Sequence, residues 1–308
     1  VKIADGCDNC CSYCAIPLIR GSFRSRAMDS ILTEAKVLLD RGVCELNLVA
    51  QDTTNYGGDL GQGMNLASLL DGIDGIGGDY WVRVLYSHPR HLTDAVLERI
   101  SGEGHTVPYI DLPLQHISDG ILTRMRRGIG ETETRRLLER IRSKYPDIAV
   151  RTTFLVGFPG ETDEHFEELA RLVCEYEFEH VGVFTYSPEP GTVAYSSQAS
   201  FVETAVMEQR RDRLMELQQQ VAMRRNSSRI GRQFRVVVEG IADEVEVEGD
   251  DMVYWRGRTS AQAPDVDDCV FFTRNHGGGD NGFASVIIDD AGSYELWGHE
   301  LEKKGVTG

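Results

Sequence analysis

Short apolar runs and amphipathic stretches alternate along residues 1–190 of the chain. The apolar runs predict strands at 1–4, 45–50, 81–86, 109–114, 149–156 and 181–186. Between them, apolar positions recur at helical spacing over 30–41, 66–71, 93–101, 119–127, 132–144 and 164–175. Strands that alternate with helices are typical of a parallel sheet with crossover helices. The pattern therefore predicts an α/β fold, an incomplete (β/α)6 barrel.

The pattern changes in the last third of the chain. Residues 200–226 are polar and predict a connector helix. Its arginines could contact RNA, but a solvated helix face is the better prediction for them: Arg210, Arg211, Arg213, Arg224 and Arg225. After Gly231, apolar and polar residues alternate in five short runs, at 234–239, 252–256, 270–273, 284–288 and 295–297. Such runs, broken by Asp and Gly, are typical of a small all-β barrel. We therefore predict two domains, residues 1–229 and residues 230–308.

Charge separates the two predicted domains further. The 308-residue chain has a formal net charge of −17, and residues 230–308 hold seven Lys and Arg against sixteen Asp and Glu, a net charge of −9. An acidic module repels phosphate backbones and attracts basic partners, although the same charge would also serve solubility alone. No apolar run approaches the roughly 20 residues that span a bilayer, so we expect no membrane partner.

Cysteine provides the candidate chemistry. Four of the seven cysteines fall between Gly6 and Cys14, directly after the first predicted strand, so they do not form a disulfide framework and we expect a reducing cytoplasm. Cys7, Cys11 and Cys14 follow a C-x3-C-x2-C spacing. An iron–sulfur cube normally takes four thiolates, so three ligands leave one iron open to a small molecule. The alternative is a zinc module built from two C-x2-C pairs, but here the pairs abut, whereas structural zinc sites separate them.

Polar residues at the ends of the predicted strands gather on the same rim as the cysteine loop, because the carboxyl ends of parallel strands share one edge. They include Gln51, Asp52, His88, His116 and Arg151, of which Arg151 is the best candidate for clamping a carboxylate. A further strand ends in a turn with little side-chain bulk, 157–160, against which an adenine could lie. The alternative is an ordinary turn before a helix that Thr162 caps.

Taken together, these residues resemble the radical S-adenosylmethionine enzymes, and within them the methylthiotransferase branch. The resemblance rests on the cysteine loop and the stretch through Arg26, on Leu114-Gln115-His116, on the turn 157–162 and on 186–192. Residues 50–57 and 257–267 are similar to the RimO type, which modifies an aspartate of the twelfth protein of the small ribosomal subunit. The tRNA-modifying MiaB type is the alternative.

The resemblance implies cofactors and residues that bind them. Cys7, Cys11 and Cys14 would hold a [4Fe–4S] cluster whose open iron binds S-adenosylmethionine, and an electron donor would reduce it. The resemblance places the following residues near the cofactor: Tyr13, Gln51, Arg151, Gly157, Phe158, Pro159 and Gly160. It identifies no catalytic side chain.

The resemblance also implies parts that this sequence does not match. Relatives carry an N-terminal domain with three further cysteines for an auxiliary cluster, whereas Cys10, Cys44, Cys174 and Cys269 are scattered here. We expect a fragment that lacks this domain and does not complete methylthiolation by itself. The acidic last domain resembles a TRAM domain, and its charge favours a basic ribosomal protein over RNA as partner.

Overall fold

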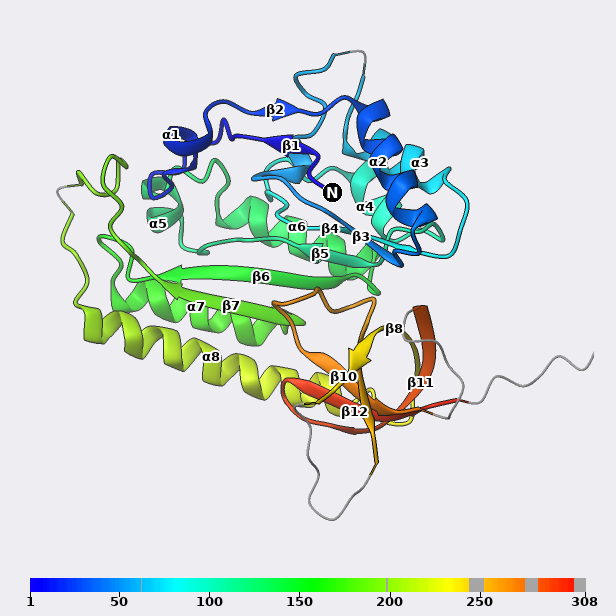
Figure 1. Ribbon diagram of the computed structural model, residues 1–308. Coiled ribbons are helices and arrows are strands. Elements are labelled where there is room, and N and C mark those ends of the chain that lie inside the picture. Colours follow the sequence, from blue (N-terminus) through cyan, green and yellow to red (C-terminus); the bar gives the residue numbers. More distant parts are fainter. Residues whose placement is uncertain (62, 198, 244–251, 275–281, 302–308) are drawn as a thin grey trace, which may run out of the picture. The chain divides into compact units, whose positions relative to one another are not determined.

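Parallel strands build the first of two units into which the chain divides, Val1–Gln218 and Gln219–Gly308 (Figure 1). The structure is a computed structural model that describes residues 1–61, 63–197, 199–243, 252–274 and 282–301. In the first unit the parallel strands come in sequence order: β1 (Ala4–Asp5), β3 (Glu45–Leu48), β4 (Trp81–Val84), β5 (Tyr109–Asp111), β6 (Ala149–Val156) and β7 (His180–Thr185).

The pairing of these strands gives an open barrel. β3 pairs with β4, and β5, β6 and β7 pair in that order, all parallel. Single parallel bridges join flanking residues: Lys2, before β1, pairs with Val49, after β3, and Val82 of β4 pairs with Thr106, before β5. Within the described ranges, no pairing closes β7 onto β1. The predicted incomplete barrel of six parallel strands is confirmed.

Helices cover the outer side of this sheet, as Figure 1 shows. The alternation along β6 explains why: Val150, Phe154 and Val156 are buried in the core, while Arg151 and Thr153 on the opposite face are half-buried. The helices are α2 (Met28–Asp40), α3 (Leu66–Asp74), α4 (Asp94–Ile100), α5 (Asp119–Arg124), α6 (Glu131–Lys144) and α7 (Asp163–Tyr176). The sequence did not predict α1 (Ile16–Arg20), the strand β2 (Arg24–Ser25), which pairs antiparallel with β1, or the 3-10 helix η1 (Thr53–Asn55).

The helix α5 is shorter than the predicted 119–127. The N–H of Arg126 donates to the Thr123 carbonyl and the N–H of Arg127 donates to the Leu122 carbonyl, both at 3.0 Å, and Arg126 has φ +53°. These two bonds and the left-handed residue form a Schellman motif, which ends a helix by satisfying its last carbonyls. Arg126 therefore occupies the position that usually holds glycine.

The connector helix α8 (Thr204–Ser227) is confirmed, but the prediction of a solvated arginine face was wrong for Arg210. Arg210 is 6% exposed. Its guanidinium binds Glu161 at 2.8 Å and Asp163 at 2.7 Å. A buried guanidinium needs such partners, and its sequence position could not reveal them.

The second unit is a closed five-stranded barrel with the strand order β10-β12-β11-β8-β9. Its strands are β8 (Gln233–Ile241), β9 (Tyr254–Thr259), β10 (Cys269–Thr273), β11 (Gly282–Ala291) and β12 (Glu295–Glu300). Inward-facing Val236, Val270, Phe272 and Val286 fill its core. The predicted small β-barrel is confirmed, while the boundary predicted after residue 229 stays a prediction. Among the described residues, none of the helices has the length and apolar character to cross a membrane.

Inside the first unit, a buried ion pair joins the neighbouring strands β3 and β4. Arg83 is fully buried, its Nε donates to Glu45 Oε1 at 2.8 Å, and its guanidinium carbon lies 4.6 Å from the centroid of the Tyr109 ring. Removing one partner of a buried pair leaves an uncompensated charge, which costs more than the pair contributes.

We predict that Glu45→Ala lowers the free energy of unfolding by about 3 kcal/mol, because Arg83 then stays buried without this carboxylate. The measurement is urea unfolding of the full chain. Asp40→Ala is the matched control, since it removes an exposed pair with Lys36 and should cost less than about 1 kcal/mol. Equal effects of the two substitutions would contradict the prediction.

Candidate functional site

The cysteine loop begins where β1 ends, and Gly6 fixes its path. Gly6 has φ +78°, and a Cβ there would lie 2.2 Å from the carbonyl oxygen of Ser22. The N–H of Cys7 donates to the Gly21 carbonyl at 3.2 Å, and Asp8 Oδ1 accepts from the N–H of Phe23 at 3.0 Å. The loop therefore lies directly against the segment that follows α1.

Ser12 fixes the other end of the loop to two further loops of the rim. Its N–H donates to the Met125 carbonyl at 2.9 Å and its hydroxyl to the Arg124 carbonyl at 2.7 Å. Its own carbonyl accepts from the N–H of Ala194 at 2.8 Å. The segments after β5 and after β7 thus hold the Ser12 end of the cysteine loop, although they are more than 100 residues away in sequence.

The thiols themselves differ in exposure. Cys7 is buried and Cys11 and Cys14 are half-buried, whereas Cys10 is exposed. Burial raises the pKa of the Cys7 and Cys14 thiols, so these two hold their protons until a metal displaces them. Arg127 Nη1 lies 3.5 Å from Cys11 Sγ, so a guanidinium stands beside this sulfur. Three partly buried thiols with one charged donor fit an iron–sulfur cluster.

A single zinc ion fits these cysteines less well. Within the part of the chain that the structure describes, one group of His, Cys, Asp or Glu brings three ligand atoms within 4.8 Å of one another: Asp52, His88 and His91. The cysteine sulfurs form no such group. One tetrahedral ion needs that closeness, while a cluster whose thiolates bind different irons does not.

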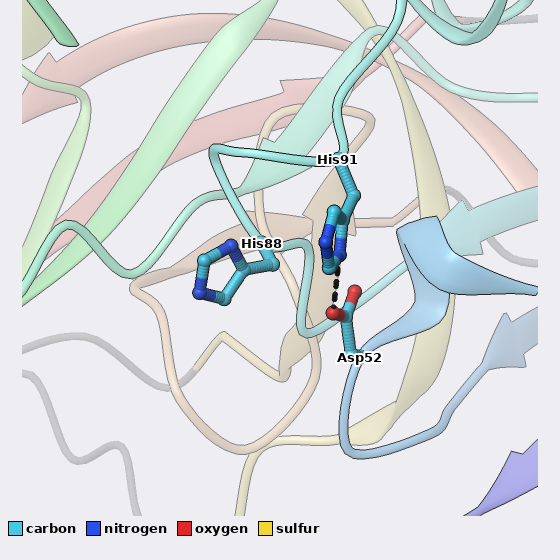
Figure 2. A group of neighbouring side chains, drawn as sticks. All are labelled: Asp52, His88 and His91. Atoms are coloured by element: carbon cyan, nitrogen blue, oxygen red, sulfur yellow. Dashed lines mark hydrogen bonds and ion pairs between the residues drawn. The ribbon is translucent and has the colours of Figure 1, made fainter. Parts of the chain in front are cut away.

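Asp52 links the cysteine loop to the ends of β3 and β4. Its Oδ2 lies 2.7 Å from both His91 Nδ1 and Asn9 Nδ2, and its Oδ1 accepts from the Thr54 hydroxyl at 2.7 Å. Figure 2 shows the contact with His91, while His88 points to the side. Burial acts to raise the pKa of Asp52, but the bonds from His91, Thr54 and Asn9 outweigh it and lower the pKa below its usual value. The carboxylate stays charged and orients Asn9.

His88 is held neutral beside this group. It is 5% exposed, and its Nδ1 accepts the N–H of Arg90 at 3.2 Å, so Nε2 carries the proton. Burial, and next the charge of Arg127, lowers the pKa of His88 to about 3.

Gln51 and Arg151 lie on the inner side of the barrel. Gln51 lines a cavity of about 600 Å³ with Ile16, Arg20 and Tyr86, and among the described residues its buried Oε1 has no hydrogen-bond partner. A ligand with a polar donor would satisfy that oxygen. Arg151 Nη1 lies 3.3 Å from Asp111 Oδ1. The guanidinium that we expected to bind a ligand carboxylate therefore already pairs with a carboxylate of the chain.

The turn 157–160 packs onto the cysteine loop. The Phe158 ring contacts Tyr13 at a centroid distance of 6.5 Å and Tyr186 at 5.4 Å, both edge-on, and Phe158 is 2% exposed. Pro159 is also buried, while Gly160 is half-buried. The N–H of Gly157 donates to Glu161 Oε2 at 2.8 Å. The structure therefore brings Tyr13 and this turn together, and the Phe158 ring serves packing.

Sequence reasoning missed several members of this site. Asn9 and Arg127 gave no local signal, because their partners Asp52 and Cys11 lie far away in sequence. His91 follows His88 by three residues in the same loop, and that spacing was a usable signal.

The comparisons with known proteins agree with this geometry. The sequence model described as the Radical SAM superfamily matches residues 1–173. The chain belongs to the radical SAM superfamily. A TRAM domain model matches residues 230–300. Membership in the radical SAM superfamily implies a [4Fe–4S] cluster and S-adenosylmethionine as cofactors, which the three thiols and the Gln51 cavity fit.

Two curated relatives carry the name ribosomal protein uS12 methylthiotransferase RimO. The chain is 43% identical to the one from Geobacter sulfurreducens over 299 residues, and 40% identical to the one from Acetivibrio thermocellus over 303 residues. These alignments cover 97% and 98% of this chain but 65% of each relative, so the chain spans about two thirds of their length.

A solved structure supports the fold of this radical SAM chain. The radical S-adenosylmethionine methyltransferase TsrM from Kitasatospora setae, with cobalamin and a [4Fe–4S] cluster bound, matches with a TM-score of 0.53 at 17% identity. The match covers 63% of this chain and 38% of TsrM. At that identity the likeness concerns the fold.

We predict that Gly6→Ala prevents cluster assembly, because the new methyl group would collide with the Ser22 carbonyl and displace Cys7. Iron bound per chain after anaerobic reconstitution is the measurement. Gly42→Ala is the matched control, since Gly42 ends α2 at φ +87° with nothing within 4 Å of the added Cβ. Both variants carry the strain of an alanine at positive φ, about 1 kcal/mol. Equal iron in the two variants would contradict the prediction.

We also predict that acid destabilises the cluster-free chain through His88. The unfolded chain protonates this histidine near pH 6.5, while the folded chain does so only near pH 3, so the free energy of unfolding falls as the pH falls from 6.5. The full effect of one such group is about 1.4 kcal/mol per pH unit. His88→Asn keeps an acceptor for the Arg90 N–H and should flatten the slope in urea unfolding between pH 7 and pH 4. An unchanged slope would show that His88 is not responsible.

Proposed function

We propose that this chain is the radical-generating and substrate-binding part of a methylthiotransferase that modifies an aspartate side chain of the ribosomal protein uS12. The observation that carries the proposal is the cysteine loop, which presents three thiols on the rim of a radical SAM barrel. The names of the curated relatives support the reaction and the substrate. A ribosomal substrate also supports a cytoplasmic location.

In this proposal Cys7, Cys11 and Cys14 hold the cluster and Cys10 does not. When bound, the cluster and S-adenosylmethionine supply an electron and a 5′-deoxyadenosyl radical that takes a hydrogen atom from an unactivated carbon. An external electron donor reduces the cluster. Arg127 lies beside Cys11 Sγ and fixes its position, and the Asn9–Asp52 bond keeps the loop in register with the strand ends.

The residues proposed to bind S-adenosylmethionine differ in how free they are to contact it. Gln51 would accept a hydrogen bond from the ligand through its unpartnered Oε1. The backbone of Gly157 to Gly160 would lie beside the adenine. Tyr13 would support this turn through its edge-on contact with the Phe158 ring. Arg151 would reach a ligand carboxylate only by sharing its guanidinium with Asp111.

Sulfur donation requires a source that this chain does not hold in our proposal. Its other cysteines are separated: Cys44 is half-buried, Cys174 lies exposed on α7, and Cys269 is buried in β10 of the second unit. No two of them are close in sequence. We propose that the auxiliary cluster expected for the full-length enzyme is not ligated by these residues.

The acidic barrel supports a basic protein substrate. Residues 230–308 have a net charge of −9, which favours contact with a basic ribosomal protein and disfavours a nucleic acid. Methylthiolation of a tRNA adenosine remains the alternative reaction. It shares the radical chemistry and differs in the charge of its substrate.

We predict that Cys7→Ala, Cys11→Ala and Cys14→Ala each reduce bound iron from about four per chain to near zero. Cys10→Ala is the matched control within the same loop and should keep the wild-type amount, because Cys10 is exposed and outside the ligand set. Iron and sulfide analysis after anaerobic reconstitution provides the measurement. One zinc per chain in place of iron would favour the zinc module.

We further predict that the reconstituted chain with dithionite and S-adenosylmethionine forms 5′-deoxyadenosine, and that purified uS12 stimulates this reaction more than tRNA does. Mass spectrometry should find no methylthiolated product from this chain. Methylthiolated uS12 would refute the proposed lack of a sulfur donor. Salt-sensitive binding to tRNA, without binding to uS12, would favour the alternative reaction.

A further inference from the structure

A second cavity lies on the outer side of the α5–α6 connection, away from the Gln51 cavity. Its volume is about 750 Å³, which is within the range of small-molecule pockets. Buried Leu92, Leu122 and Leu137 form an apolar floor. Arg90 from the loop after β4, Arg126 from the α5–α6 connection, and Arg136 and Arg140 from α6 stand around it.

Three of these guanidinium groups have no partner. Among the described residues, the side chains of Arg90, Arg126 and Arg136 make no hydrogen bond or ion pair, and all three residues are exposed. Arg140 pairs with Asp94 at 3.1 Å, and Glu133 is the carboxylate that lines the cavity. Several other arginines of this acidic chain are paired with carboxylates: Arg99, Arg135, Arg142 and Arg213.

The backbone at the α5–α6 connection has two left-handed positions, one at Arg126 and one at Gly128 beside Arg90. Arg126 holds the left-handed position of the Schellman motif, where a residue with a Cβ is strained and glycine is favoured. Gly128 has φ +69°, and a Cβ there would lie 2.9 Å from Arg90 Nη1. Gly128 lies beside Arg90, and the strained position 126 holds a charged side chain that makes no hydrogen bond or ion pair among the described residues.

The ligand class follows from the number of charges. Three guanidinium groups around one cavity call for an anion with more than one charge and several acceptor oxygens. A phosphate monoester carries close to two charges and three acceptor oxygens, and two successive phosphodiesters of a nucleic acid backbone together carry two charges, while a carboxylate carries one charge. The apolar floor would accept a flat uncharged part of the same ligand.

We propose that this cavity binds a phosphate-bearing ligand, either a free phosphate compound or the backbone of an RNA. The Schellman turn connects this site to the cysteine loop, because it directs Arg126 into the cavity and the next residue, Arg127, toward Cys11. A ligand bound there would lie behind the turn that holds the Ser12 end of the loop. The proposal does not depend on the reaction, and its test needs no cluster.

The test uses the cluster-free full chain and two probes, inorganic pyrophosphate by calorimetry and a labelled single-stranded RNA oligonucleotide by fluorescence anisotropy, in roughly 50 mM salt. We expect at least one probe to bind. Arg126→Gly should weaken that binding about tenfold, the usual loss for a charge-assisted hydrogen bond. The same variant should melt at or above the wild-type temperature, because glycine relieves the strain at φ +53°, so unfolding cannot explain the loss.

Two further variants complete the test. Arg90→Gln with Arg136→Gln should weaken binding further, and Arg41→Gln is the matched control, since Arg41 is exposed and lies outside the cavity. Binding of pyrophosphate alone would identify a free phosphate compound as the ligand source, and tighter binding of the oligonucleotide would identify RNA. The proposal is overturned if neither probe binds the wild type, or if Arg126→Gly binds both probes as tightly as the wild type.

Discussion

Hydrogen bonds that reach the cysteine loop from distant parts of the chain determine the geometry of the site. A nine-residue loop with no regular secondary structure cannot by itself hold three thiols in place, because each ordered residue loses conformational entropy. Ser12 binds the segments after β5 and β7, and Asn9 binds Asp52 after β3. The loop is therefore only as rigid as the barrel, and the barrel strands must form first for the thiols to converge.

Charge is distributed according to what each part of the chain must do. Inside the first unit, charged groups are paired: Glu45 with Arg83, and Arg151 with Asp111. Residues 230–308 carry a net charge of −9. The cavity beside α5 and α6 differs from these parts, because three arginines whose side chains have no partner among the described residues gather around it. Local excess charge of one sign is a physical basis for attracting a ligand of the other.

Local patterns of the sequence predicted most elements, and tertiary contacts explain where they did not. The spacing of apolar residues located the six parallel strands and the strands of the C-terminal β-barrel. Burial on one or both faces of a strand gives a regular pattern of apolar positions. It predicted α5 too long, because the Schellman turn that ends this helix has Arg126 in the left-handed position. A glycine there would have indicated the helix end, whereas an arginine does not. It placed Arg210 in solvent, because its partners Glu161 and Asp163 lie on another segment.

The candidate site shows the same division. The three cysteines could be named from spacing, as could Gln51 from its place at a strand end. Asn9 and Arg127 could not, because each acts through a contact with a residue more than 40 positions away. Spacing identifies ligands within one loop, whereas the groups that orient a loop come from wherever the fold brings them.

The central claim is that Cys7, Cys11 and Cys14 hold a cluster with one iron open to S-adenosylmethionine. Electron paramagnetic resonance of the reconstituted, dithionite-reduced chain tests it most directly. The account predicts the signal of one reduced cluster, with a line shape that changes when S-adenosylmethionine is added, because the open iron gains new ligands. A signal that stays unchanged on addition, or a chain that takes up zinc and gives no signal, would contradict the account.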